Sequence, residues 1–224
     1  MALTLPRGQA TNILAALTVL AFLPVQILGE TSRAAILAGF IPERLSALGA
    51  AVDMPDIPWL PLWITPLTAT LIHANWLHLG FNMLLLLFCG RFVEQLLGQG
   101  RTVLIYIVGA YAAALGQWAI PGFQDGGGDG IVPMIGASGA ISALLGTYAM
   151  IYGQRTVRAI GFVPAYVVRM AWLAVAWTGL QLLIAVAGGL DSFFGGIAIG
   201  AHIGGFIAGL LLARPLLAHR FRPS

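Results

Sequence analysis

Long apolar runs separated by short polar stretches make up most of this 224-residue chain. A helix needs about 20 mostly apolar residues to cross a bilayer, because its backbone polar groups must be paired within the hydrocarbon. The apolar runs predict six membrane-spanning helices, over roughly residues 11–29, 76–97, 102–120, 135–153, 165–187 and 196–213. We therefore expect an all-α, polytopic membrane protein.

The connections between these runs show no linker, low-complexity tract or repeat, which predicts one membrane domain over residues 1–224. Its core would cover about 11–213, and 214–224 would form a short C-terminal tail. The first run lacks the cleavage site of a signal peptide, so we expect a retained helix. The long connection over 30–75 is rich in Leu, Ile, Pro and Trp, which favours the membrane interface; the alternative is a loop packed on the bundle.

The composition agrees with a membrane protein, because 59% of the residues are hydrophobic and only 8% are charged, against about 25% charged in soluble domains. Every basic residue is an arginine, and the loops on one side of the predicted helices hold only Arg33 and Arg44. Seven of the eight acids lie on that same side. By the positive-inside rule, both termini face the cytoplasm. No basic run is dense enough to suggest nucleic-acid binding.

Polar side chains at membrane depth are costly and are therefore candidates for function. On the topology above they share the outer half of the membrane, and they are His73, His78, Asn82, Ser138, Ser142 and His202. Asn75 is a good N-cap, which predicts that the second helix begins at Trp76 and that His73 precedes it. Ser138 is expected in the first turn of the fourth helix, where backbone N–H groups have no intrahelical partner.

These residue types are the ones that acyl transfer requires: a hydroxyl nucleophile, an imidazole base and donors for an oxyanion. We assign Ser138 as nucleophile, His202 as base, and His78 with Asn82 as donors. The nearby acids lie in loops, so we expect a Ser–His dyad rather than a triad. Metal binding by His73, His78 and His202 is the rival interpretation, but no carboxylate or thiol lies at their depth, and no metal or cofactor is expected.

Small residues on two of the predicted helices support this arrangement. They recur every four positions, which allows two helices to approach closely. The stripes are Ala201, Gly205 and Gly209 on the sixth helix and Ser138, Ser142 and Gly146 on the fourth. Contact between the two stripes would bring His202 to Ser138.

Three stretches give the chain a resemblance to the rhomboid family of intramembrane serine proteases, over about residues 65–213. Each is similar to a family motif, HxxxxHxxxN, GxSG or AHxxGxxxG. They are His73-Ala-Asn-Trp-Leu-His78-Leu-Gly-Phe-Asn82, Gly136-Ala-Ser138-Gly139 and Ala201-His202-Ile-Gly-Gly205-Phe-Ile-Ala-Gly209.

The resemblance implies a six-helix rhomboid bundle and an endopeptidase that cuts transmembrane segments of other proteins near the outer face. Ser138 would form an acyl-enzyme with His202 as base and later acid. The residues implied to form or support the oxyanion site, besides the Ser138 amide, are His78, Asn82, His73 and Gly136. The expected partners are transmembrane-helix substrates and the lipid bilayer, and the expected location is a bacterial inner membrane.

The sequence departs from the family pattern at Ser142, where many members have an aromatic residue. We expect its hydroxyl to hold the catalytic ring by a hydrogen bond. The glycine-rich stretch 125–130 is predicted to be a flexible outer turn, and residues 191–196, with two phenylalanines, are predicted to cap the site. The fifth helix, with Trp172 and Trp177, is predicted to border lateral access.

Two other classes of function remain as alternatives at this point. One is a catalytically silent rhomboid-like protein that binds transmembrane clients; loss of Ser138 or His202 would favour it, and both are present. The other is a transporter or channel, which a polar cluster confined to one half of the bilayer does not favour.

Overall fold

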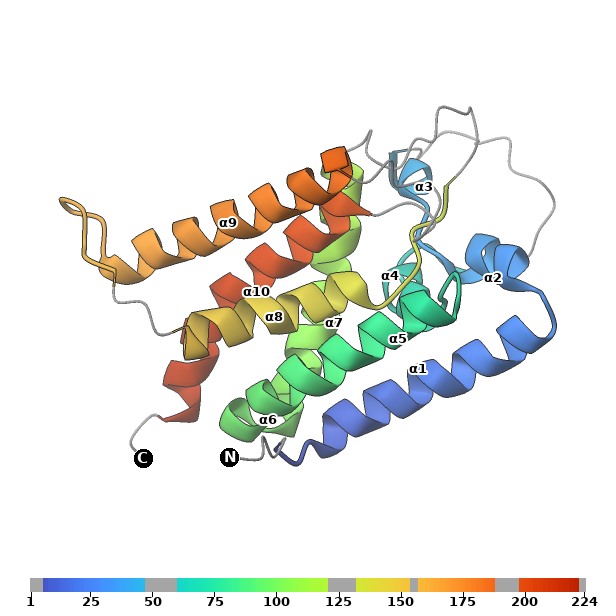
Figure 1. Cartoon of the computed structure of the whole chain (residues 1–224), viewed down its shortest axis with the longest axis horizontal. Coiled ribbons are helices and arrows are strands. Elements are labelled where there is room, and N and C mark those ends of the chain that lie inside the picture. Colours follow the sequence, from blue (N-terminus) through green and yellow to red (C-terminus); the bar gives the residue numbers. More distant parts are fainter. Residues whose placement is uncertain (1–5, 47–59, 121–131, 154–156, 188–197, 222–224) are drawn as a thin grey trace.

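A computed structural model describes residues 6–46, 60–120, 132–153, 157–187 and 198–221; for 46 and 181–187 it describes the backbone alone. Within these residues the regular elements are helices (Figure 1), which confirms the all-α prediction. Four stretches are long and apolar enough to cross a membrane: Gln9–Ile27, Trp76–Leu97, Gln99–Ala119 and Ile199–Arg220. Two shorter apolar helices, Ser138–Tyr152 and Ala165–Leu180, lie in the fourth and fifth predicted spans.

The helices follow one another along the chain as two groups. The first group is one long helix followed by four short ones: α1 (Gln9–Ile27), α2 (Thr31–Ala38), α3 (Pro42–Ser46), α4 (Thr65–Thr68) and η1 (Ala69–Leu71). The second group builds most of the bundle: α5 (Trp76–Leu85), the π-helical η2 (Leu86–Gly90), α6 (Arg91–Leu97), α7 (Gln99–Ala119), α8 (Ser138–Tyr152), α9 (Ala165–Ala187) and α10 (Ile199–Arg220).

Helix direction places the starts of three helices at one end of the bundle. Figure 1 shows α5, α8 and α10 running the same way, with the start of α1 and the end of α10 toward the opposite end. The chain positions 78, 138 and 202, each close to the start of its helix, therefore lie at a common end. The predicted outer turn 125–130 and the predicted cap 191–196 fall outside the described residues.

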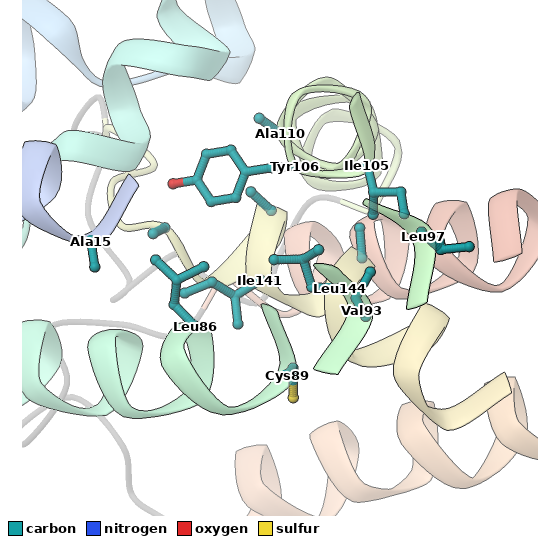
Figure 2. Packing of buried hydrophobic residues seen from close by; sticks show 13 residues of the cluster. Ala15, Leu86, Cys89, Val93, Leu97, Ile105, Tyr106, Ala110, Ile141 and Leu144 are labelled. Carbon is teal, nitrogen blue, oxygen red and sulfur yellow. The ribbon is translucent and has the colours of Figure 1, made fainter. Parts of the chain in front are cut away.

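The apolar core lies between the helices that carry the site. Leu86, Val93, Ile141 and Leu144 are fully or almost fully buried, and Figure 2 shows their side chains directed toward one another from η2, α6 and α8. Tyr106 of α7 closes one side of this cluster. Dense packing of this kind fixes how α5, α6 and α8 sit against each other.

Helix α10 packs most extensively against α8 and α7. A Cβ added to Gly205 would overlap the carbonyl of Gly139, and one added to Gly209 would overlap that of Ala143. Thr147 Oγ1 also donates to the Gly209 carbonyl, at 3.0 Å. The predicted close contact of the fourth and sixth helices is confirmed. The sixth-helix stripe meets Gly139 and Ala143 besides Ser142 of the predicted fourth-helix stripe, whose Cβ lies 3.4 Å from an added Cβ on Gly205.

Helix α10 continues past the predicted end of the sixth span. The prediction ended this helix at residue 213 and treated 214–224 as a tail, but the helix runs to Arg220 with Pro215 inside it. A proline removes only its own backbone donor and bends a helix without always ending it. The end of α10 is tied to the bundle by Arg101 of α7, whose guanidinium lies 2.8 Å from Nδ1 of His219.

Candidate active site

Ser138 and His202 lie in direct contact at the starts of two neighbouring helices. His202 Nε2 is 2.7 Å from Ser138 Oγ, although the residues are 64 positions apart. Ser138 is the first residue of α8 and thus lies in its first turn, as predicted. His202 lies at the end of the first turn of α10, where its N–H donates to the carbonyl of the N-cap residue Ala198 at 3.1 Å. A hydroxyl and an imidazole at this separation can exchange a proton.

The start of α8 also supplies backbone donors beside the hydroxyl. The amide of Ser138 belongs to the first helical turn, whose N–H groups have no partner within the helix. The N-terminal end of a helix carries a partial positive charge, which favours an anion at this point. The Ser138 amide is therefore suited to stabilise an oxyanion next to Oγ.

The turn that delivers Ser138 depends on Gly136. Its φ is +106°, a value that side-chain-bearing residues rarely adopt. Its N–H donates to the Ala69 carbonyl at 2.9 Å, and a Cβ at this position would lie 2.7 Å from Cε1 and Nε2 of His78. Gly136 thus provides both the turn and the space that the His78 ring occupies.

His78 points a donor into the same space. Asn75 caps α5 as predicted, accepting from the His78 N–H at 2.8 Å. The Ala74 N–H donates to His78 Nδ1 at 3.4 Å, which assigns the proton of a neutral ring to Nε2. Nε2 lies beside Gly136 and is therefore a second candidate donor for an oxyanion.

Asn82 lies one helical turn beyond His78 and is buried, with 4% of its surface exposed. Its Nδ2 donates to the His78 carbonyl at 2.8 Å, while Oδ1 is buried and has no partner among the described residues. Within the described part of the chain no hydrogen bond joins Asn82 to Ser138 or His202. An amide has two N–H groups, so one of them remains for a substrate.

His73 lies in the segment before α5, as predicted, and is 1% exposed. Its Nε2 accepts a long hydrogen bond of 3.5 Å from the Ala137 N–H, immediately before Ser138. Its ring packs edge-on against His78 at a centroid distance of 5.0 Å and against Phe22 at 6.4 Å. His73 therefore supports the turn before the serine and one face of His78.

Ser142 uses its hydroxyl differently from the prediction. Oγ donates to the Ser138 carbonyl, one turn earlier in α8, at 2.8 Å. Serine in an apolar helix commonly bonds to the carbonyl four residues earlier, because no water competes for that hydroxyl. The bond of Ser142 is therefore to the nucleophile's backbone and not to the His202 ring.

Two residues that were not among the predicted site residues contact the backbone around His202. Gln117 of α7 accepts from the Ala201 N–H at 3.2 Å, and Trp177 of α9 donates to the His202 carbonyl at 3.3 Å. Gln117 is a polar residue near the outer end of an apolar run, which is the signal that selected the other candidates. Trp177 was predicted only as part of the helix that borders lateral access, because tryptophan is ordinary in a membrane helix and gave no sign of a contact with His202.

A small cavity of about 10 Å³ lies beside the nucleophile. Its lining includes Ser138, Gly136 and Thr70. A cavity needs about 10–15 Å³ by this measure to hold one water, and the water needs polar partners. The space beside Ser138 is thus close to the size of a single water molecule.

The fold and the site define a helical membrane protein with a close serine–histidine pair at the starts of two packed helices. The Rhomboid domain matches residues 62–219, more than two thirds of the chain. The chain belongs to the rhomboid family.

Named relatives are bacterial. The chain is similar to "Rhomboid protease GluP" of Bacillus subtilis (27% identity over 206 residues, covering 92% of this chain and 34% of the relative). It is also similar to "Rhomboid protease GlpG" of Photorhabdus laumondii (33% over 170 residues, 75% and 52%) and of an Enterobacter species (32% over 146 residues, 65% and 46%). The chain thus spans about a third to a half of the length of these relatives.

Proposed function

We propose that this chain is an intramembrane serine endopeptidase that cleaves transmembrane segments of other proteins near the outer face of the membrane. The observation that carries the proposal is the 2.7 Å contact between His202 Nε2 and Ser138 Oγ. Membership of the rhomboid family and the protease names of its relatives support the same activity.

In the first half of the reaction, Ser138 Oγ attacks the carbonyl carbon of the scissile peptide bond while His202 Nε2 takes the hydroxyl proton. The carbonyl oxygen becomes an oxyanion. The Ser138 amide, His78 Nε2–H and the second Nδ2 hydrogen of Asn82 would donate hydrogen bonds to it. When the carbon–nitrogen bond breaks, His202 gives its proton to the leaving amine, and the acyl group remains on Ser138 as an ester.

In the second half, a water molecule replaces the leaving amine. His202 takes a proton from this water, and the resulting hydroxide attacks the ester carbon. The ester bond breaks, the new carboxyl product leaves, and Ser138 Oγ recovers its proton from His202. Because lipid holds no water, the site must open to the outer aqueous phase. Its place at the starts of α8 and α10 agrees with this requirement.

We propose further that six helices span the membrane and that both termini lie in the cytoplasm. Helices α8 and α9 would add two spans to the four stretches that are long and apolar enough to cross a membrane. The arginine distribution supports the orientation. The bacterial relatives favour a bacterial inner membrane as the location. Membership of the rhomboid family favours transmembrane helices of other proteins as substrates.

The proposal is tested by cleavage of a model single-span substrate with purified protein in detergent and by labelling with a fluorophosphonate. Ser138→Ala and His202→Ala should each reduce cleavage by about 10³-fold or more. Ser32→Ala on exposed α2 and His219→Ala at the far end of α10 are the matched controls and should keep wild-type rates.

Wild-type cleavage by Ser138→Ala would show that another group is the nucleophile and would overturn the assignment. Absence of both cleavage and labelling in the folded wild-type protein, together with binding of the substrate, would instead indicate a silent rhomboid-like protein that holds transmembrane clients.

A further inference from the structure

The backbone of the proposed base is held on both sides by side chains from two different helices. Gln117 of α7 accepts from the N–H of Ala201, immediately before His202. Trp177 of α9 donates to the carbonyl of His202 itself. Both contacts fall on the turn of α10 that brings His202 to Ser138. They can therefore influence the position of the imidazole.

The Gln117 contact fixes the first turn of α10 against α7. The Ala201 N–H lies in that turn and has no acceptor within its own helix, and it lies at membrane depth, so a side-chain acceptor is worth more there than at a wet surface. Gln117 is 3% exposed and supplies it. The backbones of α7 and α10 also approach closely here, because a Cβ on Gly200 would lie 2.6 Å from the Gly116 carbonyl oxygen.

The Trp177 contact connects α9 to the same turn. Its indole lies flat on Phe206, one turn after His202, with ring centroids 5.0 Å apart and planes at 13°. Its Nε1–H reaches back to the His202 carbonyl at 3.3 Å. Helix α9 packs against α10 less extensively than α7 or α8 do, so this pair of contacts is a substantial part of their connection.

We propose that Gln117 and Trp177 are positioning residues that hold His202 at Ser138. Together they set the rotation and the depth of the first turn of α10, and so the distance from Nε2 to Oγ. The inference rests on the proposed function, because it assigns His202 as the base. A displacement of about 1 Å between reacting groups can cost about 100-fold in rate. Small movements of this turn would therefore lower the rate of cleavage.

The test uses two substitutions that remove one hydrogen bond each. Trp177→Phe keeps an aromatic ring on Phe206 but loses the donor, and Gln117→Leu keeps similar volume but loses the acceptor. Each should lower kcat about threefold to tenfold with KM unchanged. Controls on the same helices are Val175→Ala, at a side chain of α9 that is 64% exposed, and Gln99→Leu, at an exposed position of α7.

The readout separates positioning from folding. Rates are divided by the amount of protein that a fluorophosphonate finally labels, and melting temperatures are measured for every variant. A lower kcat per labelled molecule, absent from the control variants, supports the inference.

Two results would overturn it. One is wild-type kcat in both Trp177→Phe and Gln117→Leu. The other is an equal loss in Val175→Ala and Trp177→Phe, which would indicate a general effect on α9. In either case the proposed function still holds if Ser138→Ala and His202→Ala are inactive. If these two variants keep activity, the proposed function itself is wrong.

Discussion

At Gly136 the backbone makes a turn that only glycine adopts easily, and the His78 ring fills the space where a Cβ would lie. Gly136→Ala should therefore push His78 away from the oxyanion position as well as strain the turn. We expect kcat to fall about 100-fold, which is the usual cost of losing one oxyanion donor. Cleavage of the model substrate and the rate of fluorophosphonate labelling measure this loss.

Gly161 provides the matched control for this substitution. It too has a positive φ, of +57°, but nothing lies within 4 Å of an added Cβ. Gly161→Ala should cost some stability and leave kcat unchanged. If Gly136→Ala kept wild-type kcat, His78 would not be an oxyanion donor held by this packing.

Which single residues come together could be predicted from the sequence further than the direction of their hydrogen bonds could. Ser138 and His202 were predictable because a hydroxyl and an imidazole at membrane depth are rare and costly. The direction of the Ser142 hydroxyl was not, since a nearby backbone carbonyl competes with the ring for it. In addition, a Cβ on Gly205 would lie 3.4 Å from Ser142 Cβ, so α10 packs closely over this position.

At the scale of helices, the contact between α8 and α10 decides whether the reacting pair can meet. Gly209 lies against the Ala143 backbone, where an added Cβ would overlap the carbonyl. Gly209→Ala should destabilise the protein by about 1–3 kcal/mol through overpacking. It should also separate the two helices and lower kcat at least tenfold. Thermal unfolding and substrate cleavage measure the two effects.

Gly179 on α9 is the control for this helix contact, because an added Cβ there meets nothing within 4 Å. Gly179→Ala should be neutral or slightly stabilising, since alanine favours a helix by about 1 kcal/mol over glycine. Equal activity of the two alanine variants would contradict the claim that the α8–α10 distance controls the rate.

Helix positions were predictable where local signals set them. Asn75 predicted the start of α5, and the side chain caps it. The π-helical segment η2 was not predictable, because the apolar pattern of residues 86–90 does not differ from that of the α-helical residues before them. Gly90 at its end packs against Thr11 of α1, where a Cβ would lie 2.8 Å from Thr11 Cγ2, and no window of sequence around residue 90 contains that contact.

At the scale of the whole molecule, one buried carboxylate ties the first helix to the rest. Glu94 of α6 is 6% exposed and accepts from the N–H groups of Ala10 and Thr11, at 3.0 and 2.8 Å, and from the Thr11 hydroxyl at 2.7 Å. It therefore caps α1 from another helix, at the N-terminal end that favours negative charge. Glu94 is the one acid that the sequence places on the arginine-rich side, and this cap of α1 was not predicted.

The orientation of the molecule in the membrane is open to a direct test, because the chain has a single cysteine. Cys89 is fully buried, so Cys89→Ala gives a background without thiols. Single cysteines then report one side each at exposed positions: Ser32→Cys in α2, Gly100→Cys at the start of α7 and Ala218→Cys near the end of α10. A membrane-impermeant maleimide added to intact cells should label the cysteine at position 32 alone. After permeabilisation it should label all three.

Labelling of position 100 or 218 in intact cells would contradict the cytoplasmic placement of the arginine-rich side. It would then leave the Ser138–His202 site on the inner side, where the proposed cleavage near the outer face could not occur.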